Sequence, residues 1–249
     1  MNLLDYPVLT LLVSFGALWF AHWAGTRLRT RRESISEEER PDFDVVLGAA
    51  LTLLGLVIGF SFSMAINRFE LRNDFEEAEA NAIETAYMRA ELVPQEDSAR
   101  IRELLRQYTD LRIQFYVNGH RESERIAAET AQVQHGLWAA VSKPAQAQPT
   151  AVAALAVASV NDAIKAEGAT REVWEDRIPV AAWALMFGIA LGCNVLYGYG
   201  SRRTDWKLSI VLPLVVAVSL AFIADMNSPR GGFIHTQPNN LERLQGTLK

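Results

Sequence analysis

The sequence predicts an all-α membrane protein with four transmembrane helices and a large helical domain outside the membrane. Four stretches contain no Asp, Glu, Lys or Arg, namely residues 7–26, 45–67, 178–201 and 208–224. Three of them reach the length of roughly 20 residues that a helix needs to cross the hydrocarbon core, and the fourth is at the short end of the range. A charged block without strand alternation separates the second stretch from the third.

By composition, the chain of 249 residues divides into four parts. Residues 1–69 hold the first two membrane helices and an Arg-rich connecting loop, and residues 70–177 form the helical extramembrane domain. Residues 178–225 hold the third and fourth membrane helices, and residues 226–249 form a polar C-terminal tail. The extramembrane block carries 19 acidic and 12 basic residues, a net charge of −7.

The second membrane helix is expected to continue without a break into the extramembrane domain. After residue 67 the chain has no Pro or Gly until Pro94, so nothing stops the helix at the membrane surface. Beyond the membrane, small residues recur every fourth position, at Ala78, Ala82, Ala86 and Ala90. Such a stripe indicates close helix packing, either within one subunit or between subunits.

Further helices in the domain are expected over residues 95–117, 122–141 and 151–166. The second of these should end before Pro144 and the third before Gly168, because both residue types interrupt helices. Another helix is expected to begin near Thr170 and to pass into the third membrane span. Pro179 would kink that helix or occupy its first turn.

Basic residues predict the orientation in the membrane. The first helix is expected over residues 3–26, and the loops after the first and third helices lie on one side. These loops hold eight basic residues, namely Arg27, Arg29, Arg31, Arg32, Arg40, Arg202, Arg203 and Lys207. The positive-inside rule places them in the cytoplasm, so the helical domain would face outward from the membrane.

No set of residues in the sequence is typical of an enzyme. The histidines show no i,i+4 zinc-binding pair, their positions being His22, His120, His135 and His235. The single cysteine, Cys193, cannot build a thiolate site. Because the basic residues form no stripe, a nucleic-acid partner is not expected either. We therefore expect no enzymatic activity and no cofactor.

Three acids on the long helix are the candidates for a cation site. Glu76, Glu77 and Glu79 could attract a divalent ion. A run of acids on a long helix is more often a solvated face, so we expect no metal site here.

The second membrane helix is the candidate pore helix. It carries Ser63 and Asn67 four residues apart, Arg68 at its mouth and Phe62 beside them. In a symmetric ring of subunits, such helices could form an apolar constriction with donor groups and a cationic mouth, which favours anions. The alternative is that Ser and Asn form hydrogen bonds between helices and the phenylalanines face lipid.

A motif beyond this helix resembles a known family. Glu79-Ala-Asn81-Ala is followed by Thr-Ala-Tyr87-Met-Arg89-Ala, and a proline follows shortly after. Together with the preceding apolar run, this motif is similar to the bacterial bestrophin-like membrane family. The C-terminal pattern with Asp225, Pro229 and Gly232 is similar to that family's ending after its last membrane helix, so the resemblance covers most of the chain.

The resemblance implies a fold and a function. Bestrophins are pentameric anion channels whose pore is lined by the second membrane helix, and their large domain lies in the cytoplasm, opposite to the side that the loop charges indicate. The first hypothesis is therefore a homo-oligomeric channel in the lipid bilayer that conducts inorganic anions. The second is a non-conducting scaffold or envelope sensor whose helical domain binds a partner. In the second case Asn81, Tyr87 and Arg89 would be packing residues of the long helix.

Overall fold

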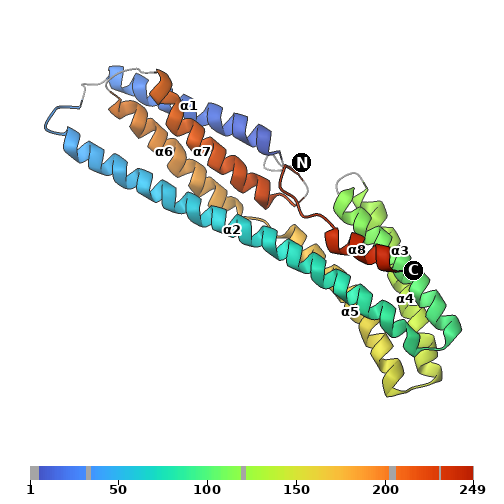
Figure 1. Ribbon diagram of the computed structural model, residues 1–249. Coiled ribbons are helices and arrows are strands. Elements are labelled where there is room, and N and C mark those ends of the chain that lie inside the picture. Colours follow the sequence, from blue (N-terminus) through green and yellow to red (C-terminus); the bar gives the residue numbers. More distant parts are fainter. Residues whose placement is uncertain (1–5, 32–34, 119–121, 202–205, 230, 249) are drawn as a thin grey trace. The chain divides into compact units, whose positions relative to one another are not determined.

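The computed structural model describes residues 6–31, 35–118, 122–201, 206–229 and 231–248. The regular elements in these ranges are all helices (Figure 1), which confirms the predicted fold class. They are α1 (Pro7–Arg31), α2 (Arg40–Arg89), η2 (Ala90–Leu92), α3 (Gln95–Val117), α4 (Ser123–Ala147), α5 (Ala151–Glu175), α6 (Val180–Gly200), α7 (Trp206–Asn227) and α8 (Asn239–Thr247).

The chain forms two compact units. The membrane unit comprises Met1–Phe69 and Arg177–His235, and the helical unit comprises Glu70–Asp176 and Thr236–Lys249. Several residues named above lie outside the described part of the chain, namely Arg32, His120, Arg202 and Arg203. Within the described ranges, four stretches of helix are long and apolar enough to cross a membrane, and they belong to α1, α2, α6 and α7. The prediction of a multi-pass membrane protein is thereby confirmed.

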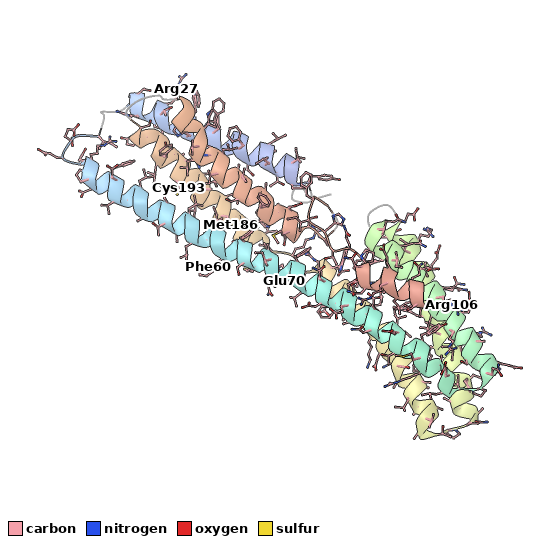
Figure 2. The ribbon with its side chains drawn as sticks, viewed as in Figure 1. Arg27, Phe60, Glu70, Arg106, Met186 and Cys193 are labelled. Carbon is pink, nitrogen blue, oxygen red and sulfur yellow. The ribbon has the colours of Figure 1, made fainter. Side chains whose placement is uncertain are left out.

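In the membrane unit, α1 packs against α6 and α7 around a core of large apolar side chains (Figure 2). Its centre includes Leu18, Met186 and Leu220, each fully buried. Two glycines let the backbones of α1 and α6 approach. A Cβ added at Gly198 would lie 2.1 Å from the His22 carbonyl oxygen, and one at Gly25 would lie 2.1 Å from that of Val195. This is the small-residue packing that membrane helices use.

In the helical unit, α3, α4, α5 and α8 pack with η2 and the second half of α2. Their shared core includes Ile83, Leu105, Leu137, Val160 and Leu241. Each helix contributes residues three or four apart, as expected for amphipathic helices that cannot bury an apolar face alone. The segment expected as a polar tail therefore contributes α8 to this core, through Leu241 and Leu244. The sequence did not reveal α8, because its few apolar residues are separated by polar ones.

Helix α2 is continuous, as predicted. It runs for 50 residues, which corresponds to roughly 75 Å of helix. The alanine stripe is only partly buried, because Ala86 and Ala90 lie in the core while Ala78 is exposed. A spacing of four residues drifts around a helix of 3.6 residues per turn, so the stripe leaves the buried face.

Four predicted helix ends are wrong. Helix α4 continues through Pro144 to Ala147, since a proline in the last turn of a helix removes only one backbone hydrogen bond. Helix α5 continues through Gly168, whose cost is offset by buried neighbours on both sides, Glu167 and Thr170. It does not pass into the membrane span, because it ends at Glu175 and Pro179 caps a separate helix, α6. Helix α1 extends to Arg31, so Arg27 and Arg29 lie on its last turns and not in a loop.

Candidate functional site

The membrane part of α2 is the least covered of the four spans. Only 11% of its most apolar stretch is buried within the chain, compared with 33% for α1 and 50% for α7. Phe60, for example, is 64% exposed (Figure 2). The uncovered side chains must therefore meet either lipid or another protein surface.

The predicted pore residues do not share one face of α2. Successive residues of an α-helix are about 100° apart, so Ser63 and Asn67 lie within about 40° of each other. Both are exposed, whereas Phe62 lies about 100° to one side. There Phe62 and Phe222 of α7 line a hollow of about 380 Å³. Arg68 lies at least about 120° from Phe62 and from Ser63, so it belongs to a different face.

Three glycines lie on the Phe62 side of α2. Gly48, Gly55 and Gly59 are within about 60° of Phe62 around the helix. A Cβ added at any of them would meet nothing within 4 Å. Glycine in a helix interior costs about 1 kcal/mol relative to alanine, so this open strip has no explanation within one chain. Close approach of a further helix is the usual reason for such a strip in membranes.

Two polar side chains on the neighbouring spans donate hydrogen bonds within their own helices. Ser219 Oγ donates to the Val215 carbonyl at 2.9 Å, and Asn194 Nδ2 donates to the Ala190 carbonyl at 2.8 Å. Both bonds stay within one helix. The alternative that such residues join the helices to one another therefore gains no support from these two.

In the helical unit, Glu79 of the family motif lies in a buried polar cluster. Its carboxylate pairs with the Arg112 guanidinium, which donates from Nε to Oε1 and from Nη2 to Oε2 at 3.3 Å. Oε2 also accepts hydrogen bonds from Thr170 at 3.1 Å and from Tyr116 at 3.5 Å. Because Glu79 and Arg112 are 0% and 1% exposed, their charges are balanced inside the protein. The cluster joins α2, α3 and α5.

A second carboxylate, Glu167, completes this cluster. It lies 3.6 Å from Arg112 Nη1, and it accepts hydrogen bonds from Arg171 at 2.6 Å and from Gln134 at 3.5 Å. Gln134 also donates to the Tyr108 hydroxyl at 3.4 Å, so α4 joins the cluster too. Burial raises the pKa of Tyr108 and of Tyr116, and the negative charge of Glu79 adds to both shifts.

Glu76 is also buried, and it holds the C-terminal helix. Its Oε1 accepts hydrogen bonds from the backbone N–H groups of Asn240 and Leu241, both at 2.9 Å. Its Oε2 accepts from Asn240 Nδ2 at 2.6 Å. A carboxylate at a helix N-terminus is favourable, and Pro238 supplies no side-chain cap of its own there. Burial raises the pKa of Glu76, although these hydrogen bonds oppose the shift.

The solvated-face interpretation of the acids on α2 is therefore wrong for Glu76 and Glu79, while Glu77 is exposed. The other motif residues lie nearer the surface. Tyr87 accepts a hydrogen bond from Arg106 Nη2 at 2.9 Å, and the Arg102 guanidinium lies 4.9 Å from its ring centre. Asn81 is exposed and Arg89 is half-buried.

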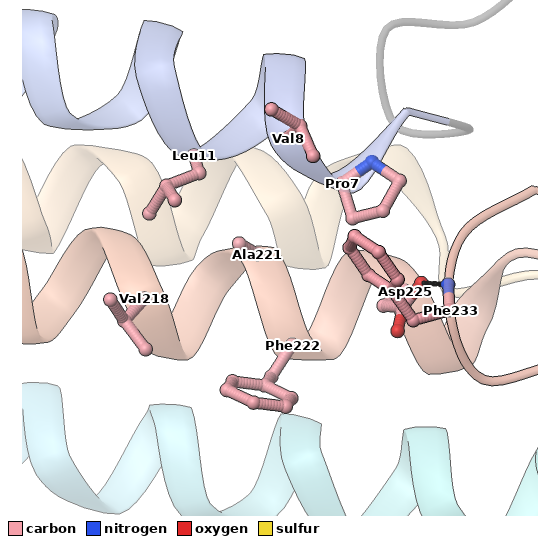
Figure 3. A pocket seen from close by; sticks show the side chains of 8 residues that line it. All are labelled: Pro7, Val8, Leu11, Val218, Ala221, Phe222, Asp225 and Phe233. Carbon is pink, nitrogen blue, oxygen red and sulfur yellow. Dashed lines mark hydrogen bonds between the residues drawn. The ribbon is translucent and has the colours of Figure 1, made fainter.

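The second motif forms a turn after α7. The buried Asp225 carboxylate accepts a hydrogen bond from the Phe233 N–H at 2.8 Å (Figure 3). It accepts another from the Ile234 N–H at 3.2 Å. Gly232 has φ of +102°, and a Cβ there would lie 1.7 Å from Asp225 Oδ1, so only glycine fits. Pro229 is buried in the same turn. Among the described residues, no group of three His, Cys, Asp or Glu side chains is placed to hold a metal.

Comparison with known proteins places this architecture. The bestrophin-like domain family matches residues 9–241. The chain belongs to the bestrophin-like family. The resemblance inferred from the motif is thereby confirmed, and the membrane helices and the helical unit both lie within the matched region. No curated protein matches this bestrophin-like chain.

Solved structures of a bacterial bestrophin homologue from Klebsiella pneumoniae share the fold. One mutant structure has a TM-score of 0.69 at 12% identity and covers 97% of both chains. A second mutant has a TM-score of 0.68 at 12% identity, covering 100% of this chain and 96% of the other. The structure phased with zinc has a TM-score of 0.64 at 14% identity, covering 97% and 95%.

Sequence reasoning missed several residues of this bestrophin-like chain. Arg112, Glu167 and Thr170 complete the cluster around Glu79, but they lie 33 to 91 residues away in the sequence. No local pattern indicates such pairing. The signal that could have found Glu76 and Glu79 is their helical phase, because they share the α2 face of the buried Ile83 and Ala86.

Proposed function

We propose that this bestrophin-like chain forms a homo-oligomeric anion channel in the bacterial inner membrane, with α2 lining the pore. The observation that carries the proposal is the low coverage of the α2 span within one chain. A helix in that position can line an axis only if neighbouring copies complete the wall. Closed rings are the common symmetry for such assemblies, and five copies is the number that the bestrophin resemblance implies.

The pore-facing side of α2 is proposed to be the arc from Phe62 to Asn67. This arc spans about 140° and includes Ser63. Phe62 would narrow the pore, and the Ser63 hydroxyl and Asn67 amide would offer donors to a passing anion. Arg68 lies outside this arc, so we propose that it acts at the mouth through its charge and not as a wall residue.

The open glycine strip supports the oligomer. Gly48, Gly55 and Gly59 leave one narrow strip of α2 without side chains over three turns, next to the hollow shared with α7. Because these glycines precede Phe62 along α2, a helix of a neighbouring copy could approach closely at a different depth of the membrane from the proposed constriction. Replacing Gly55 by Leu would then weaken the oligomer, whereas Leu at Gly16 on α1, where an added Cβ also meets nothing, would not.

The oligomeric state tests this proposal first. The mass of the purified protein in mild detergent, measured by light scattering with the detergent contribution subtracted, should correspond to several copies. A stable monomer would contradict the channel, because the proposed pore needs α2 helices from several copies to enclose it. The scaffold or sensor would then be the better description. Anion efflux from liposomes tests conduction itself.

A further inference from the structure

The segment after α7 is held at two points by buried carboxylates. We call residues 228–248 the C-terminal strap. In the membrane unit, Asp225 accepts hydrogen bonds from the N–H groups of Phe233 and Ile234. In the helical unit, Glu76 accepts them from the N–H groups of Asn240 and Leu241. Each carboxylate thus binds two successive backbone amides of the strap, and each is at most 3% exposed.

The C-terminal end of the strap is packed into the core of the helical unit. Leu241, Leu244 and Leu248 are buried in the core. The Leu248 carbonyl accepts a hydrogen bond from Arg106 Nε at 3.1 Å, and Gln245 Nε2 donates to Asp110 at 2.6 Å. These contacts fix α8 on both sides, so Glu76 holds a helix that also has its own apolar attachment.

The near end is equally constrained. Gly231 N–H donates to Ser228 Oγ at 3.0 Å, and Gly232 adopts a conformation that only glycine fits beside Asp225. Asn227 Oδ1 at the end of α7 accepts a hydrogen bond from the Ile178 N–H at 2.9 Å, which ties this end to the start of α6. The turn is therefore connected to the ends of two membrane helices, α6 and α7.

Only five residues separate the two anchored pairs of amides. A link of this length restricts how far either anchor can loosen while the other holds. We propose that the strap couples the two units, so that an intact anchor at Asp225 stabilises the anchor at Glu76 and the reverse. This inference rests on the proposed channel for its purpose, since in a channel the helical unit would act through the strap on the membrane end of α7.

Hydrogen exchange tests the coupling without requiring conduction. Glu76→Gln removes the charge at one anchor and should speed exchange of the Asn240 and Leu241 amides by roughly tenfold or more. Coupling predicts that it also speeds exchange at Phe233 and Ile234, which are in the other unit. Asp225→Asn should likewise speed exchange of the Asn240 and Leu241 amides, because coupling between two sites is reciprocal.

Two controls make the test decisive. Insertion of Gly-Ser-Gly-Ser after His235 should leave both anchors protected but abolish the effect of each substitution on the distant anchor. Glu129→Gln alters an exposed carboxylate of the helical unit that pairs with Arg125 on α4, so it should leave Phe233 and Ile234 unchanged. Effects confined to the mutated end, or unaltered by the insertion, would overturn the coupling.

Conduction gives an independent readout. In liposomes, Glu76→Gln, Asp225→Asn and the insertion should change anion flux in the same direction, and the double substitution should change it no more than the larger single one. Additive effects on flux would overturn the coupling. Absence of flux from the unmodified protein would refute the channel instead, and the exchange data would still decide whether the strap couples the units.

Discussion

The Glu79 carboxylate and the Arg112 guanidinium form a bidentate pair that is shielded from solvent inside the helical unit. Glu79 belongs to the motif that resembles the bestrophin-like family, whereas Arg112 lies on the next helix. The pair therefore gives that motif residue a physical role. It fixes the extension of α2 against α3, and Thr170 brings in α5.

Breaking this pair should destabilise the helical unit strongly. Arg112→Met leaves Glu79 buried without its main charge partner, which typically costs about 3–5 kcal/mol in the free energy of unfolding. Glu79→Gln should be similarly damaging, and the double substitution should cost less than the two single effects added. Denaturant unfolding in detergent measures these changes. Glu129→Gln, which breaks an exposed pair with Arg125, should change little, and equal losses in all variants would argue against a special role for the buried pair.

The close contact between α1 and α6 should not tolerate alanine. Gly198→Ala would place a Cβ against the His22 backbone, and backbone cannot move aside as a flexible side chain does. We expect a loss of at least about 1–3 kcal/mol, seen as a lower melting temperature in detergent. Gly16→Ala is the matched control on α1, because its added Cβ meets nothing within 4 Å. A tolerated alanine at Gly198 would contradict the close packing.

The buried tyrosines should resist ionisation. Burial raises the pKa of Tyr108 and of Tyr116 above the unfolded-state value of about 10. The unfolded state therefore releases these protons first, and stability that is fully present below about pH 10 is lost as the pH rises beyond it. In an ultraviolet titration to about pH 11, Tyr108 and Tyr116 should stay protonated while the protein is folded.

Phenylalanine variants assign that titration. Tyr108→Phe should leave the absorbance change of the folded protein unaltered and should reduce that of the denatured protein. A reduced change in the folded protein would show that Tyr108 titrates normally, contrary to its burial.

The side of the membrane that the helical unit faces can be settled with cysteines. Cys193 is buried, so the unmodified protein should react little with a membrane-impermeant maleimide. The loop charges predict that Ala128→Cys on α4 is labelled in intact cells while Glu38→Cys before α2 is labelled only after lysis. The opposite pattern would contradict the charge rule and agree with the arrangement that the bestrophin resemblance implies.

The features predicted correctly are those that depend on residue type along one stretch of sequence. Uncharged runs located the four spans, and the absence of Pro and Gly after Asn67 predicted the unbroken helix. Helix ends at Pro144 and Gly168 were mistaken, because packing on both sides outweighed a small local penalty. The missed cluster around Glu79 depends on which helices meet, and this is set by the whole core. Helix α8 was missed because Leu241 and Leu244 become apolar anchors only when α3 lies beside them.

Anion efflux from liposomes is the measurement that most directly tests the central claim, which is a pore lined by α2. Liposomes that hold the purified protein and are loaded with chloride should release it faster than protein-free liposomes loaded in the same way. A potassium ionophore starts the efflux in both. Phe62→Ala should raise the rate by widening the constriction, whereas Phe20→Ala, which removes an exposed ring from α1, should leave it unchanged. A conducting protein with equal rates in all three forms would contradict a pore lined by Phe62. No flux from correctly inserted protein would contradict the channel itself.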